Sequence, residues 1–188
     1  MKSSQISLFN LSEGNITEDS RAKSISFFCK RRPVLINKDV IAEMKAISKM
    51  RGNKNIRVCL HDSPKSKHHD MIILEHGNIL YPPHKHLYKG EAFHVIEGIL
   101  SVFAFDSKGG IIDCVKLQPS DIYRVEVGMF HAVLPISDIV IYHENKPGPF
   151  LGNGDSVFPD WIPSPDNINE MEKYKNRLLK TIKNIEKE

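Results

Sequence analysis

The middle of the chain alternates between short apolar runs and polar turns, a pattern typical of β-strands. Eight runs follow residue 55 without a helical segment between them: Ile56–Leu60, Met71–Leu74, Ile79–Tyr81, Ala92–Phe105, Ile111–Leu117, Ile122–Val127, Ala132–Ile136 and Ile139–Tyr142. The glycines of the segment 106–110 can supply the positive φ of a hairpin. Many short strands without intervening helices predict an all-β sandwich or barrel.

Two stretches with helical periodicity flank the strands. Residues 38–51 repeat apolar side chains at helical spacing, with Asn37 or Asp39 as the cap, and we expect this helix to cover one side of the core. Residues 167–187 carry an apolar stripe among charges, formed by Ile168, Met171, Leu178, Leu179, Ile182 and Ile185. The stripe fits packing on its own domain or on a twin subunit, so a homodimer is one expectation.

Three segments are expected along the chain. Residues 1–54 form an N-terminal arm and a helix packing on the barrel, residues 55–146 form the barrel, and residues 147–188 form a Pro/Gly-rich segment with the C-terminal helix. The arm is polar and mixed up to residue 33, apart from an apolar burst at Ile25–Cys29. That burst can add an edge strand or pack on a neighbouring subunit.

Length and composition describe one soluble globular domain with extra segments. The chain has 188 residues, of which 40% are hydrophobic and 26% are charged, and its net charge is +3. The basic residues are scattered apart from the run 30–32, so we expect no nucleic-acid partner. Three cysteines without a CxxC pair fit a reducing compartment. Because the start lacks the apolar stretch of a signal peptide and no run of 18 apolar residues occurs, a cytoplasmic protein without a membrane partner is predicted.

Three histidines and a glutamate carry the most chemical information: His84, His86, Glu91 and His131. On a strand, residues i and i+2 face the same side, so His84 and His86 can point at one ion. Imidazole suits transition metals and carboxylate suits harder ions. These residue types predict one divalent metal ion, with Fe, Zn, Mn and Ni not distinguished. The alternative is that the histidines lie at strand ends and only form hydrogen bonds.

The spacing of these residues resembles the two sequence motifs of the cupin superfamily. The first motif is HxH, three or four residues, Glu, six residues and Gly. The chain matches every fixed position of it from His84 to Gly98. The second motif keeps the spacing from Gly128 to His131, but Glu126 stands where proline is usual and Ser120 where the opening glycine is usual. The resemblance implies a cupin jelly-roll β-sandwich and a metal ion held by the four residues above.

A wider set of segments resembles the WbuC-type cupin-fold metalloproteins. The likeness covers about residues 38–163, and its segments are Arg57–His61, Pro83–His86, Phe105–Asp106, Glu144–Pro149 and Trp161–Pro163. Members of this family lie among genes for surface polysaccharide synthesis. The resemblance therefore implies a small-molecule ligand such as a sugar or a sugar nucleotide. The family commonly has asparagine at the position of Cys59.

Six further residues are candidates for the chemistry: Glu144 and Tyr123 for catalysis, Arg57, His61 and Lys146 for ligand binding, and Lys89 as a residue beside the ligands or the substrate. An arginine can pair with a carboxylate or phosphate of a ligand, or form a surface ion pair. Tyr123 either lines the mouth of the barrel or fills its core. The family comparison favours Glu144 over His143 for the interior, where Arg57 or a metal-bound water is its expected partner.

Other histidines are expected to lie outside the site. His94 stands an odd number of positions from Glu91, so strand alternation turns it to the opposite face. His68 and His69 are expected in a solvated loop.

Three functions fit this pattern. The leading one is a metal-dependent isomerase or epimerase acting on a sugar or sugar nucleotide, because a metal with an open position and a nearby glutamate can supply Lewis-acid and acid–base roles. The second is an iron-dependent oxygenase. The third is a non-catalytic module in which the metal only positions a small molecule. The fold alone does not decide, since one scaffold hosts many chemistries.

Overall fold

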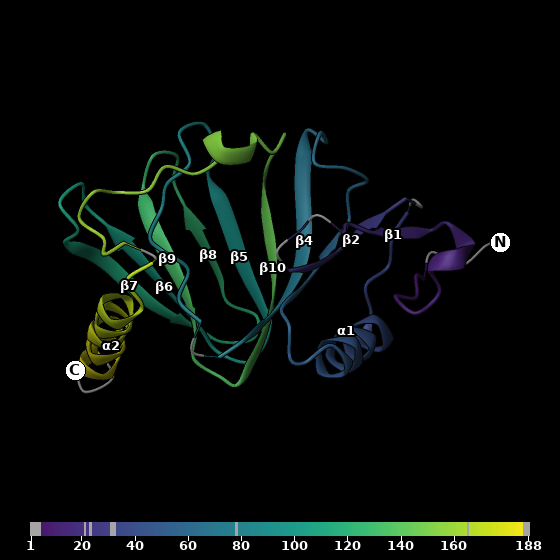
Figure 1. Cartoon of the computed structure of the whole chain (residues 1–188), viewed down its shortest axis with the longest axis horizontal. Coiled ribbons are helices and arrows are strands. Elements are labelled where there is room, and N and C mark those ends of the chain that lie inside the picture. Colours follow the sequence, from purple (N-terminus) through teal and green to yellow (C-terminus); the bar gives the residue numbers. More distant parts are fainter. Residues whose placement is uncertain are drawn as a thin grey trace.

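The structure is a computed structural model that describes residues 5–20, 22, 24–30, 33–77, 79–164 and 166–185. The strands form a sandwich with α1 and α2 on opposite sides of it (Figure 1). In chain order the elements are η1 (Leu11–Glu13), β1 (Ile16–Glu18), β2 (Ile25–Cys29), α1 (Lys38–Met50), β3 (Ile56–Cys59), β4 (His68–His76), β5 (Glu91–Glu97), β6 (Leu100–Phe105), β7 (Ile111–Leu117), β8 (Ile122–Val125), β9 (Phe130–Pro135), β10 (Ile139–Pro147), η2 (Gly152–Gly154) and α2 (Ile168–Ile185).

The strand order is that of a jelly roll. The larger sheet has the order β1-β2-β3-β4-β10-β5-β8 and the smaller one the order β7-β6-β9. An antiparallel bridge between His84 and His131 places residues 84–85 beside β9, as a fourth short strand of the smaller sheet. Each sheet then takes four of the eight strands that run from β4 to β10, and all their pairings are antiparallel. The predicted all-β jelly-roll sandwich with flanking helices is confirmed.

Strand alternation divides the apolar side chains of the larger sheet between two faces. Met71, Ile73 and Tyr142 face the smaller sheet and join the cluster between the two sheets. Their neighbours Ile72 and Leu74 face the other way, into a cluster that includes side chains of α1 and the N-terminal segment. The larger sheet is therefore covered on both faces, which explains why α1 carries an apolar stripe.

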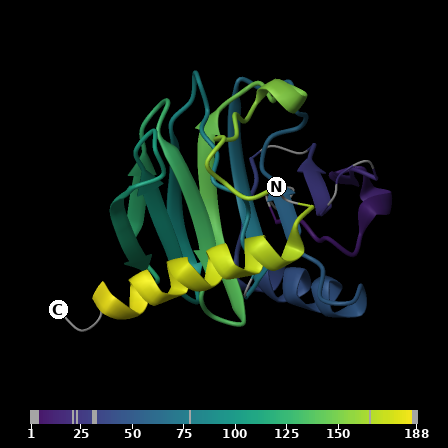
Figure 2. The same ribbon diagram turned by 60° about the vertical axis from the view of Figure 1, so that its left-hand side comes forward.

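The C-terminal helix packs on its own chain. Tyr174, Leu178 and Ile182 of α2 are buried in a cluster with side chains of β6 and β9, and α2 lies across the strands in Figure 2. Of the two alternatives for this helix, packing on its own domain is the one found. The predicted stripe is wrong at its ends, because Ile168 and Ile185 are exposed. A homodimer stays a prediction, and so does the division into residues 1–54, 55–146 and 147–188.

The structure also changes the predicted strands. The burst Ile25–Cys29 is not an edge strand: β2 lies between β1 and β3, and all five of its residues are buried. The single run predicted over 92–105 is two strands separated by a turn at Gly98. This glycine has a φ of +82°, and a Cβ there would lie 2.4 Å from the carbonyl oxygen of Ile139, so a side chain is excluded on both grounds. Residues 79–81 form no strand.

Smaller predictions are settled by local contacts. Asn37 is the cap of α1, because its side-chain oxygen accepts hydrogen bonds from the backbone N–H groups of Asp39 and Val40, each at 3.1 Å. Cys29 and Cys59 are buried, and Cys114 is half-buried. Neither helix of the described residues has the length and apolar character to cross a membrane.

Candidate metal centre

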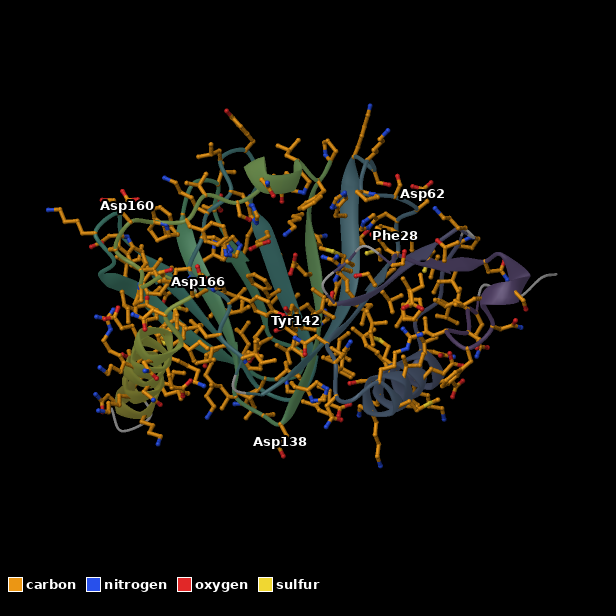
Figure 3. The ribbon with its side chains drawn as sticks, viewed as in Figure 1. Phe28, Asp62, Asp138, Tyr142, Asp160 and Asp166 are labelled. Carbon is orange, nitrogen blue, oxygen red and sulfur yellow. The ribbon has the colours of Figure 1, made fainter. Side chains whose placement is uncertain are left out.

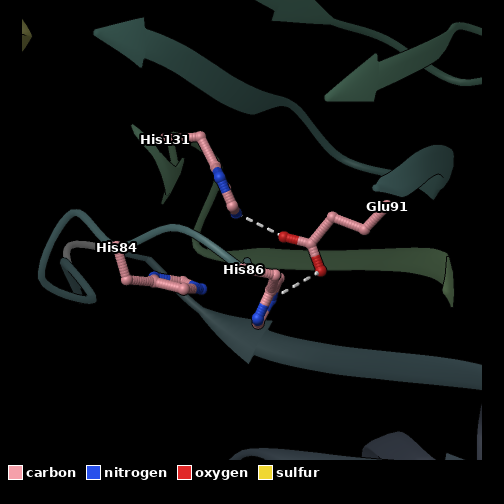
Figure 4. A group of neighbouring side chains, drawn as sticks. All are labelled: His84, His86, Glu91 and His131. Carbon is pink, nitrogen blue, oxygen red and sulfur yellow. Dashed lines mark hydrogen bonds and ion pairs between the residues drawn. The ribbon is translucent and has the colours of Figure 1, made fainter. Parts of the chain in front are cut away.

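Four side chains from three segments meet in one group (Figure 4). The ligand-type atoms of His84, His86, Glu91 and His131 all lie within 4.8 Å of one another, and every member except His84 is buried. Backbone hydrogen bonds of 3.0 and 2.9 Å between His84 and His131 fix the first segment beside β9, and Glu91 is the first residue of β5. The HxH pair therefore turns both imidazoles to one side, as its spacing predicts.

Each histidine is fixed by the same kind of bond on its Nδ1 atom. The carbonyl oxygens of Pro82, Asp155 and Met129 accept hydrogen bonds from Nδ1 of His84, His86 and His131, at 3.2, 2.5 and 3.0 Å respectively. A carbonyl oxygen can only accept, so Nδ1 carries the proton and Nε2 is the atom left for an ion. Bonds of this kind set the tautomer and orientation of histidines that bind metals.

The Nε2 atoms of His86 and His131 converge on the carboxylate of Glu91. Nε2 of His131 contacts Oε1, and Nε2 of His86 lies 3.5 Å from Oε2. This His86 nitrogen is buried and has no hydrogen-bond partner among the described residues. A buried polar atom without a partner is costly, and an ion bound between the four side chains would satisfy it. The donor set therefore fits a divalent metal ion.

The pKa values of His84 and Glu91 are shifted toward the protonation states that coordinate a metal, whereas burial acts to lower the pKa of His86 but its contact with Glu91 raises it. Burial, followed by the neighbouring His131, lowers the pKa of His84 to about 4, so this imidazole is neutral at pH 7. Burial acts to raise the pKa of Glu91, but the charge of Lys146 and the neighbouring imidazoles of His131 and His86 hold it well below its usual value. Neutral imidazole and ionised carboxylate are the forms that bind metal ions.

Three nitrogens and one carboxylate leave one or two positions of a five- or six-coordinate ion open. Open positions distinguish catalytic or ligand-binding sites from closed structural ones. An ion held here can polarise a carbonyl or hydroxyl oxygen of a bound molecule.

Two of the predicted residues, Lys146 and Glu144, adjoin the group. Nζ of Lys146 lies 3.0 Å from Oε2 of Glu91 and 2.8 Å from Oε1 of Glu144. Glu144 faces the interior, as predicted, while His143 on the opposite face pairs with Asp70 at 3.2 Å. Of the two expected partners of Glu144, Arg57 was wrong: Lys146 takes that place, because residues two apart on β10 face the same side. A metal-bound water as partner stays a prediction.

The other predicted residues have no described contact with the four-residue group. The guanidinium of Arg57 donates to a serine hydroxyl on β2 at 3.2 Å. His61 stacks on His69, with ring centroids 4.2 Å apart. Tyr123 is partly buried against the cluster between the sheets, and its hydroxyl donates to Asp113 at 2.7 Å in an exposed position.

The other histidines considered in the sequence, His94, His68 and His69, differ in how well their predicted positions agree with the structure. His94 is absent from the four-residue group, as alternation predicts. His68 is exposed, but the expected solvated position of His69 was wrong. His69 is the second residue of β4 and is only 4% exposed, because the strand begins three residues earlier than the apolar run suggests.

Sequence reasoning missed Glu75 and Asp155. Alternation along β4 could have found Glu75, because it continues the interior series of Met71 and Ile73. The carboxyl of Glu75 is buried beside the hydroxyls of Tyr81 and Tyr142. Tyr142 lies near the centre of Figure 3. No local signal marks Asp155, whose carbonyl reaches His86 across 69 residues of sequence.

We predict that Glu75→Gln removes much of the pH dependence of stability between pH 5 and 8. Burial, followed by the charge of Glu144, raises the pKa of Glu75 from 4.5 to about 7. The folded chain therefore binds more protons than the unfolded chain in this interval, and stability falls as pH rises, by about 3 kcal/mol once the carboxyl is ionised. Glutamine cannot ionise, so the variant is expected to exceed the wild type in stability at pH 8 but not at pH 5.

Urea unfolding of both proteins at the two pH values measures this difference. A stability difference between variant and wild type that is the same at pH 5 and pH 8 would contradict the prediction.

Comparisons with known proteins give a partial family match. A family model described as a domain of unknown function, DUF6016, matches residues 36–117, a range that includes His84, His86 and Glu91 but not His131. No curated protein matches the chain.

Several solved structures are similar in part. KdgF from Halomonas sp. is 14% identical, with 50% of this chain and 80% of that chain covered and a TM-score of 0.42. L-ribose isomerase from Cellulomonas parahominis is 16% identical, with 56% and 69% covered and a TM-score of 0.47. An uncharacterised protein with a double-stranded β-helix domain from Klebsiella pneumoniae is 16% identical, with 56% and 80% covered and a TM-score of 0.43. The jelly-roll assignment itself follows from the strand order of this chain.

Proposed function

We propose that this chain is a WbuC-type cupin metalloprotein in which His84, His86, Glu91 and His131 hold one divalent ion. One observation carries the proposal: three histidines, each fixed through Nδ1 on a backbone carbonyl, bring their ligand-type atoms and that of Glu91 within 4.8 Å of one another. Iron, zinc, manganese and nickel all accept such a donor set.

The activity we propose is isomerisation or epimerisation of a sugar or sugar nucleotide in surface polysaccharide metabolism. The bound ion supplies Lewis-acid polarisation of a carbonyl or hydroxyl oxygen. Glu144 takes a proton from the carbon beside the carbonyl. In isomerisation it delivers this proton to the former carbonyl carbon while the hydroxyl proton moves to the carbonyl oxygen, and in epimerisation solvent reprotonates the first carbon from its opposite face. Lys146 keeps the Glu144 carboxylate in place through their 2.8 Å ion pair. Arg57 and His61 are proposed ligand contacts, and Tyr123 is left out because its hydroxyl is engaged by Asp113.

Deuterium exchange tests the activity. Metal-loaded protein is incubated in D₂O with a set of nucleotide sugars, and ¹H NMR follows the loss of carbon-bound proton signals. Wild type is expected to exchange a proton of at least one sugar, and Glu144→Gln is expected to lose exchange while keeping its metal. The matched control is Glu126→Gln, because Glu126 is exposed and forms a surface ion pair with Arg124.

The other outcomes identify the competing functions. Oxygen uptake by iron-loaded protein upon addition of a substrate would replace the isomerase proposal with an oxygenase. Binding of a sugar without exchange or oxygen uptake would leave a non-catalytic module. Unchanged exchange by Glu144→Gln would remove Glu144 from the proposed chemistry.

A further inference from the structure

The segment from Pro149 to Phe158, which follows β10, lies against both histidines of the HxH pair. The carbonyl of Asp155 accepts the hydrogen bond from Nδ1 of His86. Lys85, between the two histidines, exchanges backbone hydrogen bonds of 3.0 and 2.9 Å with Val157. The ring of Phe158 lies 6.1 Å from that of His84, between centroids. This segment is therefore an outer wall of the metal centre, although it comes after the last strand of the sandwich.

A buried ion pair fixes the segment. Nζ of Lys89 contacts Oδ1 of Asp155, and the two side chains are only 6% and 5% exposed. The same Nζ donates to the carbonyl of Pro149 at 2.6 Å, and the same Oδ1 accepts from the backbone N–H of Leu151 at 3.0 Å. The ion pair of Lys89 and Asp155 therefore connects Pro149, Leu151 and Asp155 to the loop between the HxH pair and β5.

Lys89, the cation of this ion pair, lies in the sequence between two of the proposed metal ligands, His86 and Glu91. Lys89 lies three residues after His86 and two before Glu91, so the loop that carries two ligands also carries the cation. The exposed ion pairs of this protein cost little to break, but a buried pair with further hydrogen bonds is costly to break on one side, because the other charge stays buried without a partner.

We propose that Lys89 and Asp155 are positioning residues of the metal centre: their ion pair holds the Asp155 carbonyl on Nδ1 of His86, and so presents Nε2 of His86 to the ion. The inference rests on the proposed metal site. Bonds to the outer nitrogen of a ligating histidine set its tautomer and direction, and their loss weakens metal binding by about 10- to 100-fold. An effect of that size is expected here.

Zinc alone is the probe. The test compares wild type with Asp155→Asn and with the double variant Lys89→Met plus Asp155→Asn, in competition with a chromophoric chelator. The double variant leaves no buried charge unpaired, so it is expected to fold even if the single variant does not. Both are expected to bind zinc about 10- to 100-fold more weakly than wild type. The matched control is Lys45→Met plus Glu97→Gln, which removes an exposed ion pair between α1 and β5 and is expected to leave zinc affinity unchanged.

A second measurement separates positioning from a general loss of stability. Ring ¹⁵N shifts of His86 in the zinc-loaded protein report which nitrogen binds the ion, and the double variant is expected to show a changed or mixed tautomer. A folded double variant with the zinc affinity and His86 shifts of wild type would overturn this inference and leave the metal site standing. Failure of the wild type to bind zinc would overturn the metal site and this inference with it.

Discussion

A His131→Ala variant is expected to bind a divalent ion about a hundredfold more weakly than the wild type. Zinc binds four-ligand protein sites with roughly 10–16 kcal/mol, so removing one ligand of four costs about 3 kcal/mol. His131 also contacts Glu91 directly, so its loss frees a second ligand to move. Competition with a chelator measures the affinity, and elemental analysis of dialysed protein measures the ion that remains bound.

The same result is expected for alanine at His84, His86 or Glu91. His94→Ala and His143→Ala are matched controls, because they remove an imidazole from β5 and β10 on the opposite face of the sheet. Both controls are expected to keep the wild-type affinity. Wild-type affinity in His131→Ala, or loss of the ion in His94→Ala, would contradict the assignment of ligands.

Replacing Lys146 by methionine is expected to lower the free energy of unfolding of the metal-free protein by about 3–5 kcal/mol at pH 7.5. Lys146 is the cation between Glu91 and Glu144, and all three side chains are mostly buried. Burial acts to lower the pKa of Lys146, but the charges of Glu144 and Glu91 raise it above its ordinary value, so the ammonium is charged. Methionine keeps the chain length and leaves two carboxylates without their counter-charge.

Urea unfolding in the presence of a chelator measures this loss. Lys45→Met is the matched control, since Lys45 pairs with Glu97 at the surface and is expected to change stability by less than about 1 kcal/mol. A loss of unfolding free energy in Lys146→Met as small as that in the control would show that the ion pairs of Lys146 with Glu91 and Glu144 contribute little to stability. Added zinc is expected to restore part of the lost stability, because the ion brings positive charge to Glu91.

The parts of the site that sequence could predict are those encoded by local spacing. The HxH pair, Glu91 and Gly98 lie within fifteen residues, and strand alternation is enough to bring two imidazoles to one side. Alternation also implied that only one of His143 and Glu144 faces the interior, and the family resemblance favoured Glu144. Gly98 has a physical reason for its place in the motif, because the turn between β5 and β6 needs a positive φ beside the backbone of Ile139.

What sequence could not predict depends on contacts between distant segments. Alternation places Lys146 on the interior face, but only the packing of β10 against β5 puts its ammonium between two carboxylates. The hydrogen bond from His86 to Asp155 and the pair of Lys89 with Asp155 each span more than sixty residues. The interior position of β2 has the same origin, because a parallel partner, β3, follows α1 in the chain.

Anomalous diffraction from crystals of the zinc-loaded protein, recorded on both sides of the zinc absorption edge, would show the metal centre directly. We expect one ion bound by Nε2 of His84, His86 and His131 and by a carboxylate oxygen of Glu91, at distances of about 2.0–2.2 Å, with at least one further position open. An ion bound elsewhere, or crystals soaked in zinc that show no anomalous peak between these four side chains, would contradict the account.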